Sequence, residues 1–89
     1  MSSNIGWELK IKERVHKKLS RFPAMDRDKI IQAIGLLCSD PYAGDVEKMK
    51  GEEHDWRRRV GAYRIFYELI IDERVIYVYH VERRTSKTY

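Results

Sequence analysis

The spacing of the apolar residues changes partway along the chain, and this change limits the folds open to it. After an alternating segment over 7–11 that favours a strand, apolar residues recur every three or four positions, as in a helix. Pro23 ends this first helical pattern. A second helix begins near residue 25 or 26 and ends by Asp40, because Pro41 disfavours helical geometry in the residue before it. The apolar stripes are Ile11, Val15, Leu19 and Phe22 in the first helix, and Ile30, Ile31, Ile34, Leu37 and Cys38 in the second.

From Trp56 onward the apolar residues alternate as in strands, and they are mostly aromatic or β-branched. The sequence predicts three strands here, over 56–60, 63–71 and 75–82. The polar stretch 42–55 is predicted to be a loop, and Gly61-Ala62 a tight turn. Two helices packed on one face of a small sheet bury the apolar surface of both. We therefore expect one α+β domain over 1–89, with two N-terminal helices on a mainly antiparallel, four-stranded sheet.

Length and composition exclude several classes of protein. A chain of 89 residues accommodates one small domain and excludes an enzyme with a separate cofactor-binding half. Its one cysteine, Cys38, excludes an intramolecular disulfide and a multi-cysteine zinc site, and suits a reducing compartment. No phosphate-binding glycine loop, serine elbow or metal-ligand spacing of histidines is present, so we expect no cofactor and no metal.

The charge of the chain favours an anionic partner. Eighteen Lys or Arg against 14 Asp or Glu give a formal net charge of +4, which suits nucleic acid or an acidic protein. The apolar runs are interrupted by charge far short of the ~20 residues that span a bilayer. Residues 1–12 lack the basic start, apolar run and small-residue cleavage site of a secretory signal. We expect a soluble, cytoplasmic protein that does not bind membranes.

The densest positive charge lies in the segment 56–64 (WRRRVGAYR), which has four arginines and no acid. Strand alternation places Arg57 and Arg59 on one face, and Arg58 on the other. Arg64 is expected to face away from the helices, so Arg57, Arg59 and Arg64 should converge on the open face of the sheet. Arg83 is expected to join them from the end of the last strand.

Neutralising acids are scarce near this cluster, since only Glu68 and Glu82 lie close to it in sequence. A group of four guanidinium groups would then repel one another unless an anion binds there. The alternative is that these arginines simply lie on a solvent-exposed sheet face and bind no ligand. Tyrosines of the strands are expected to pack in the sheet or core, whereas Tyr89 ends the chain and belongs to no apolar pattern.

Four motifs in order resemble a known family. They are Lys48-Met49-Lys50-Gly51, Trp56-Arg57-Arg58-Arg59-Val60-Gly61, Ala62-Tyr63-Arg64-Ile65-Phe66-Tyr67-Glu68 and His80-Val81-Glu82-Arg83-Arg84. Together with the helix pair, they resemble the RelE branch of the RelE/ParE toxin superfamily. The resemblance implies the toxin of a type II toxin–antitoxin system, an endoribonuclease that cleaves mRNA in the ribosomal A site. It also implies a RelB-like antitoxin, acidic and partly disordered when free, alongside the ribosome and mRNA as partners.

The resemblance also implies functional residues. By position, the catalytic set falls on Arg57, Arg59, Arg64, Arg83 and Tyr89. Further contacts to RNA are expected from Lys48, Lys50, Arg58, Arg84 and Lys87. The implied reaction is attack of a ribose 2′-OH on the adjacent phosphate. Arginines suit the stabilisation of the phosphorane but are poor proton carriers, so Tyr89 is the preferred proton-transfer group and Lys87 a weaker one. The general base is left open.

Two other functions stay possible at this point. A ParE-like toxin would inhibit DNA gyrase by binding, without nuclease activity, and would share the same fold. A degenerate member would bind only its antitoxin. The retained set of four arginines and Tyr89 favours the nuclease, because gyrase inhibition would not require it.

Overall fold

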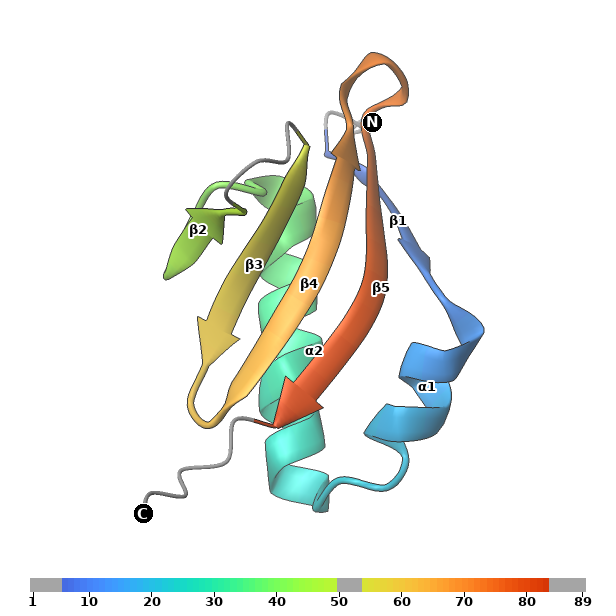
Figure 1. The fold of residues 1–89 in the computed structure, drawn as a ribbon, viewed down its shortest axis with the longest axis vertical. Coiled ribbons are helices and arrows are strands. Elements are labelled where there is room, and N and C mark those ends of the chain that lie inside the picture. The colour runs from blue at the N-terminus through green and yellow to red at the C-terminus, as the bar shows by residue number, and fades with distance from the viewer. Residues whose placement is uncertain (1–5, 50–53, 84–89) are drawn as a thin grey trace.

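The computed structural model describes residues 6–49 and 54–83, which form two helices and one five-stranded sheet (Figure 1). The elements are β1 (Glu8–Ile11), α1 (Glu13–Leu19), α2 (Ala24–Ser39), β2 (Val46–Lys48), β3 (Asp55–Val60), β4 (Tyr63–Ile70), the 3₁₀ turn η1 (Ile71–Glu73) and β5 (Val75–Arg83). The strand order is β1-β5-β4-β3-β2. Only β1 and β5 pair in parallel, and the other neighbours are antiparallel. The predicted α+β class is confirmed.

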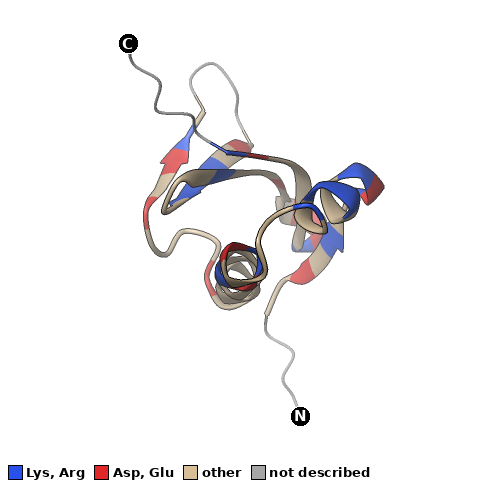
Figure 2. Ribbon diagram, turned by 90° about the horizontal axis from the view of Figure 1, so that it is seen from below, with Lys and Arg blue, Asp and Glu red and all other residues tan. Residues whose placement is uncertain are grey.

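One face of the sheet is covered by α2, which lies behind the strands in Figure 1 and is seen end-on in Figure 2. In β4 every second residue is buried, as the alternation predicted. These residues are Tyr63, Ile65, Tyr67 and Leu69. They form one core with Ile30, Ile34 and Leu37 of α2 and with Val15 and Leu19 of α1. We call the face of the sheet turned away from α2 the open face.

The sheet has one strand more than the sequence predicted. Val46–Lys48, which was expected to lie in a loop, is the strand β2 and pairs with β3 at the edge of the sheet. Its three residues are mostly polar and exposed, so they show no alternation from which a strand could be recognised. This strand matters for the site, because residue pairs across β2 and β3 place Glu47 directly opposite Arg57.

The apolar face of α2 is narrower than predicted. Ile31 is 51 % exposed, and Cys38 is only partly buried. The helix ends at Ser39, as expected, because the next residue, Asp40, has an extended backbone and precedes Pro41. The hydroxyl of the buried Tyr67 donates a hydrogen bond to the carbonyl oxygen of Pro41 at 2.6 Å, which ties the segment before β2 to the core. No helix in the described part of the chain is long and apolar enough to cross a membrane.

The partner of β5 changes along its length. β1 pairs with β5 as far as Val78, and beyond this point α1 lies beside the strand (Figure 1). The Nε atom of Arg14 donates to the carbonyl oxygen of Tyr79 at 3.3 Å, at the edge that β1 has left. On the other side, the register with β4 shifts so that Phe66 lies opposite His80 and Tyr67 opposite Val78. Tyr79 is therefore an extra residue in β5.

Candidate functional site

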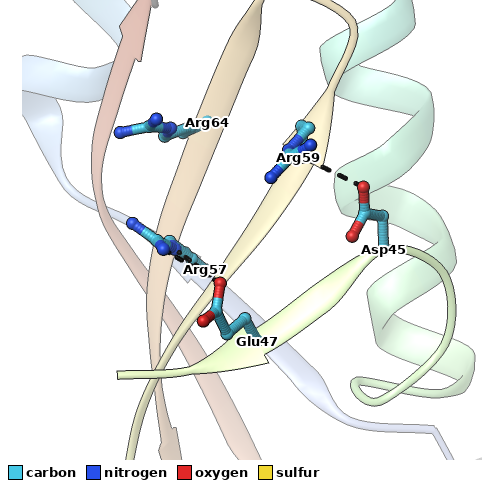
Figure 3. Close-up of a pocket in the computed structure, with 5 residues that line it drawn as sticks. All are labelled: Asp45, Glu47, Arg57, Arg59 and Arg64. Atoms are coloured by element: carbon cyan, nitrogen blue, oxygen red, sulfur yellow. Dashed lines mark hydrogen bonds and ion pairs between the residues drawn. The ribbon is translucent and has the colours of Figure 1, made fainter. Parts of the chain in front are cut away.

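Three of the predicted site arginines come together on the open face. Arg57 and Arg59 of β3 and Arg64 of β4 line one pocket with Asp45 and Glu47 (Figure 3). Arg59 and Arg64 are direct partners across the two strands, and Arg57 lies two residues before Arg59 in β3. Their convergence follows from strand alternation, because directly opposed residues of paired strands share a face. Their predicted convergence on the open face is confirmed, while their catalytic role stays a prediction.

Each of the three arginines has a carboxylate partner, so the expectation that neutralising acids are scarce was wrong. Arg57 donates to Glu47 Oε1 from NH2 at 2.9 Å and from Nε at 3.3 Å. Arg59 Nε lies 3.7 Å from Asp45 Oδ2, and Arg64 NH1 lies 3.3 Å from Glu82 Oε2. Glu47 lies in β2 and Asp45 directly precedes this strand, and both belong to the segment that was predicted to be a loop. The carboxylates remove the repulsion that an empty cluster would suffer.

Two of these ion pairs are well exposed and therefore exchangeable, whereas the side chains of the Arg64–Glu82 pair are only 28 % and 35 % exposed. The side chains of the Arg57–Glu47 pair are 34 % and 63 % exposed, and those of Arg59–Asp45 are 52 % and 65 % exposed. Pairs this accessible contribute little net stability, because water and salt screen both charges. A phosphate oxygen presents the same geometry to a guanidinium fork as a carboxylate does. The pocket is thus a site for oxyanions that the chain's own carboxylates occupy.

Glu47 has the closest electrostatic link to the arginines. Its hydrogen bond from Arg57 and the charge of Arg57 lower the pKa of this carboxyl, and Arg59 and Arg64 lower it further. All three guanidinium groups therefore act on one carboxylate, which stays ionised at neutral pH. Sequence reasoning missed Glu47, and no local signal marks it, because its position depends on the pairing of β2 with β3.

Arg83 does not join the other three. It lies opposite Tyr63, whose side chain points into the core on the α2 side, and its Cζ is 5.9 Å from the centre of the Tyr63 ring. Arg83 was expected to follow the last strand, whereas β5 includes it. Alternation then gives the open-face position to Glu82 and the opposite face to Arg83. The expected convergence of four arginines is corrected to three.

Two of the residues expected to contact RNA also point to the opposite face. Lys48 is paired with Trp56, and Arg58 with Val46 and the buried Ile65. The guanidinium of Arg58 packs on Gly44, where a Cβ would lie 2.8 Å from its Cζ. Its buried Nε has no hydrogen-bond partner among the residues that the structure describes. The remaining residues of the predicted set, Lys50, Arg84, Lys87 and Tyr89, lie outside the described residues.

An aromatic group borders the arginine pocket on the open face. The centre of the Phe66 ring lies 6.4 Å from the centre of the Tyr79 ring and 5.3 Å from the centre of the His80 ring. His80 Nε2 is 3.4 Å from Glu82 Oε1, and Glu82 also binds Arg64. The extra residue in β5 brings both Tyr79 and His80 against Phe66, and the sequence carried no sign of it. The described ranges contain no group of three or more His, Cys, Asp or Glu that could hold a metal ion.

Comparisons with known proteins agree with the motifs. Residues 9–87 match the family model of the ParE toxin of the type II toxin–antitoxin system parDE. A protein of Methanocaldococcus jannaschii that bears the toxin name RelE1 is 28 % identical over 81 residues, which cover 88 % of this chain and 90 % of that protein.

Solved structures share the fold. The archaeal RelE–RelB complex from Pyrococcus horikoshii matches with a TM-score of 0.81 and 24 % identity, covering 93 % of this chain and 100 % of that one. The isolated RelE toxin of Escherichia coli matches with a TM-score of 0.79 and 18 % identity, covering 91 % and 87 %. The RelB–RelE complex from Methanococcus jannaschii matches with a TM-score of 0.69 and 26 % identity, covering 83 % and 88 %. The chain therefore belongs to the ParE toxin family of type II toxin–antitoxin systems, within the RelE/ParE superfamily that its motifs resemble.

Proposed function

We propose that this toxin is an endoribonuclease that cleaves mRNA in the ribosomal A site and so inhibits translation. The observation that carries the proposal is the convergence of Arg57, Arg59 and Arg64 in one oxyanion pocket on the open face (Figure 3). Three guanidinium groups at one point match a phosphodiester, whose charge grows as the phosphorane forms. The names of the similar proteins, which are RelE toxins, support the same class.

The proposed chemistry is an internal transfer at phosphorus. The 2′-oxygen of a ribose forms a bond to the adjacent phosphorus and gives up its proton, while the bond from phosphorus to the 5′-oxygen breaks and that oxygen takes a proton. The products are a 2′,3′-cyclic phosphate and a 5′-hydroxyl. Arg57, Arg59 and Arg64 hold the phosphate and stabilise the dianionic phosphorane, exchanging their carboxylates for its oxygens.

Proton transfer needs groups other than arginine, whose pKa exceeds ~12. Tyr89, implied by the family resemblance, lies outside the described residues. Glu47 is the second candidate, because its carboxylate lies in the pocket and stays ionised under the influence of all three arginines. We propose that Glu47 accepts the 2′-OH proton and that Tyr89 delivers the proton to the leaving oxygen.

A cleavage assay on programmed ribosomes tests the activity. The purified toxin should cleave ribosome-bound mRNA and leave the same naked RNA nearly intact. Arg64→Ala should abolish cleavage, and Arg27→Ala on α2 is the matched control that keeps it, because Arg27 lies on the helix behind the sheet. If the Arg64→Ala toxin cleaves as fast as the unchanged protein, the open-face pocket is not the site.

The catalytic role that the resemblance implies for Arg83 is a separate proposal. Here the described contact is with the ring of Tyr63, away from the pocket. We expect Arg83→Ala to abolish growth arrest in cells while leaving antitoxin binding largely intact. Normal toxicity of this variant would remove Arg83 from the site.

The family's name favours a second function, because the matched family is that of ParE toxins. As a ParE-like toxin, the protein would block supercoiling by DNA gyrase and would need no ribosome. A supercoiling assay with purified gyrase separates the two functions: inhibition there, with no ribosome-dependent cleavage, would replace the nuclease proposal.

The partner proposed for this toxin is a RelB-like antitoxin, acidic and partly disordered when free, since two of the similar structures are complexes of RelE with RelB. We propose that the toxin acts in the cytoplasm, where ribosomes translate mRNA. Co-expression with the product of a neighbouring small reading frame should restore growth. Continued arrest with every such neighbour would contradict this assignment.

A further inference from the structure

The strongest unneutralised charge of the described chain lies on α1 and not in the arginine pocket. In the pocket, each of the three arginines faces a carboxylate. On and just after α1, four cations recur at helical spacing and so share one side of the helix as a stripe, and the α1 ribbon is largely blue in Figure 2. The stripe consists of Arg14, Lys17, Lys18 and Arg21. Within 6–49 and 54–83, none of the four forms an ion pair.

These four cations line a groove between α1 and β5, with a volume of about 360 Å³. Its floor is apolar, made by Val15 and Val81, and His80 closes the side toward the sheet. The groove exists because β1 leaves β5 after Val78, and a helix cannot follow the edge of a strand as closely as another strand does. Among the described residues that line the groove, none is acidic.

Two side-chain contacts connect the groove to the arginine pocket. His80 lines the groove, and its Nε2 lies 3.4 Å from Glu82 Oε1. The other carboxylate oxygen of Glu82 lies 3.3 Å from NH1 of Arg64, which lines the pocket. The two cationic sites are therefore neighbours along the open side of β5, with the ring of Phe66 beside His80. A ligand longer than one phosphate could occupy both.

The spacing of the stripe fits a chain of negative charges better than a single anion. Positions 14, 17 and 18 lie on α1 and position 21 follows its last residue, so the seven steps from 14 to 21 span about 10 Å at a helical rise of about 1.5 Å per residue. Single-stranded RNA presents a phosphate at every nucleotide, and its affinity comes mainly from such contacts along a basic groove. The aromatic rings between the two sites offer a surface on which a base can stack.

We infer that the α1–β5 groove binds the phosphate backbone of the RNA strand whose scissile phosphate lies in the arginine pocket. This inference rests on the proposed nuclease function and adds a second binding subsite to it. The bound strand runs from the pocket past His80 onto α1. Lys17, Lys18 and Arg21 contact its phosphates, while Arg14 keeps its hydrogen bond to Tyr79.

Salt-dependent binding of RNA tests the groove directly. The probe is a single-stranded oligoribonucleotide with 2′-O-methyl groups, which blocks the proposed cleavage and lets affinity be measured on the full-length toxin. We expect Lys17→Gln/Lys18→Gln to reduce the slope of log K against log salt by about 1.4, because each lost phosphate contact removes about 0.7. Lys17→Arg/Lys18→Arg should retain the slope, and thermal unfolding of both variants confirms that they fold.

The matched control is Arg27→Gln/Lys29→Gln on α2. It removes the same charge from one exposed and one partly exposed residue, as the groove variant does, but on a helix that contributes no residue to the groove. Above 0.1 M salt, where the Debye length is about 10 Å or less, the control should leave the slope unchanged. Equal losses in both variants would show that only net charge matters, and no loss in the groove variant would show that RNA does not bind there.

Two further measurements complete the test. Binding of an acidic peptide shows whether the groove binds a protein instead of RNA, and cleavage on ribosomes tests the pocket separately from the groove. If the groove variant loses affinity for a glutamate-rich peptide but not for RNA, the groove binds a protein and the inference is overturned. The proposed function is tested on the unchanged toxin by cleavage on ribosomes. A toxin that cleaves there, with a groove variant that binds RNA normally, would refute the groove alone.

Discussion

Replacing Glu47 with glutamine would separate the two roles that this carboxylate has in the proposed site. Glutamine keeps the size and one oxygen that can accept from Arg57, but it removes the charge and the ability to take a proton. As a competitor, Glu47 holds Arg57 away from RNA; as a base, it starts the reaction. Losing the competitor should strengthen RNA binding, whereas losing the base should slow cleavage, so Glu47→Gln should affect the two quantities in opposite directions.

The expected change in RNA affinity follows from the exposure of the ion pair, and the expected change in cleavage rate follows from the usual effect of removing a general base. The Arg57–Glu47 pair is 34 % and 63 % exposed, so its loss should free Arg57 for RNA with a gain in affinity of about two- to fivefold. Loss of a general base costs typically 10²–10⁴-fold in rate. We therefore expect tighter binding of uncleavable RNA together with cleavage on ribosomes that is slower by about 10²-fold or more.

The assay pairs affinity for the 2′-O-methyl RNA with single-turnover cleavage on programmed ribosomes. Asp45→Asn is the matched control, because Asp45 lines the same pocket and pairs with Arg59 at 3.7 Å. It should raise affinity similarly and leave the cleavage rate within a few-fold. If Glu47→Gln cleaves as fast as the unchanged toxin, Glu47 is not the base. If neither variant binds RNA more tightly, the carboxylates do not compete with phosphate.

The other predictions rest on single contacts of Glu47, Tyr67 and Gly44. The NMR titration midpoint of Glu47 should lie below the usual value of about 4.3 and rise toward it in Arg57→Gln, because Arg57 is the main cause of its lowered pKa. Tyr67→Phe leaves the carbonyl of Pro41 without its buried partner and should cost about 1–3 kcal/mol, seen as a lower thermal unfolding midpoint. Burial raises the pKa of Tyr67 above the value of about 10 of an unfolded tyrosine. The stability that this shift contributes is fully present below about pH 10 and is lost as the pH rises further. The Tyr67→Phe variant should therefore lack this loss of stability at alkaline pH. Gly44→Ala should destabilise the protein by about 1 kcal/mol or more, because Gly44 has a φ of +83° and its Cβ would press on Arg58.

The elements that periodicity predicted are those whose partners are apolar. β4 alternates strictly between buried and half-buried residues, and its inward face was identified from sequence. The helices were predicted for the same reason, although Ile31 is half exposed because α2 buries a narrower stripe than its apolar residues suggest. Burial leaves a repeating mark in the sequence, since each position of the repeat meets the same surface.

The parts of the site that sequence did not predict depend on pairing between distant segments. Glu47 meets Arg57 only because β2, three residues long, joins the edge of the sheet. Arg83 leaves the open face because β5 extends by one residue, and His80 reaches the groove beside an extra residue in the strand. A shift of one residue exchanges the two faces of a strand, so these positions needed the register itself.

The self-neutralised pocket offers a physical reason for the proposed dependence on the ribosome. Three arginines on so small a sheet are tolerated because Asp45, Glu47 and Glu82 offset their repulsion. RNA must displace these carboxylates, and each exchange weakens binding a few-fold, so free RNA competes poorly at the pocket. A message held in place by the ribosome presents its phosphate at a high effective concentration, in the millimolar range for tethered partners, which overcomes the internal competitors. Cleavage is then restricted to RNA that is already positioned, without any change in the toxin's own fold.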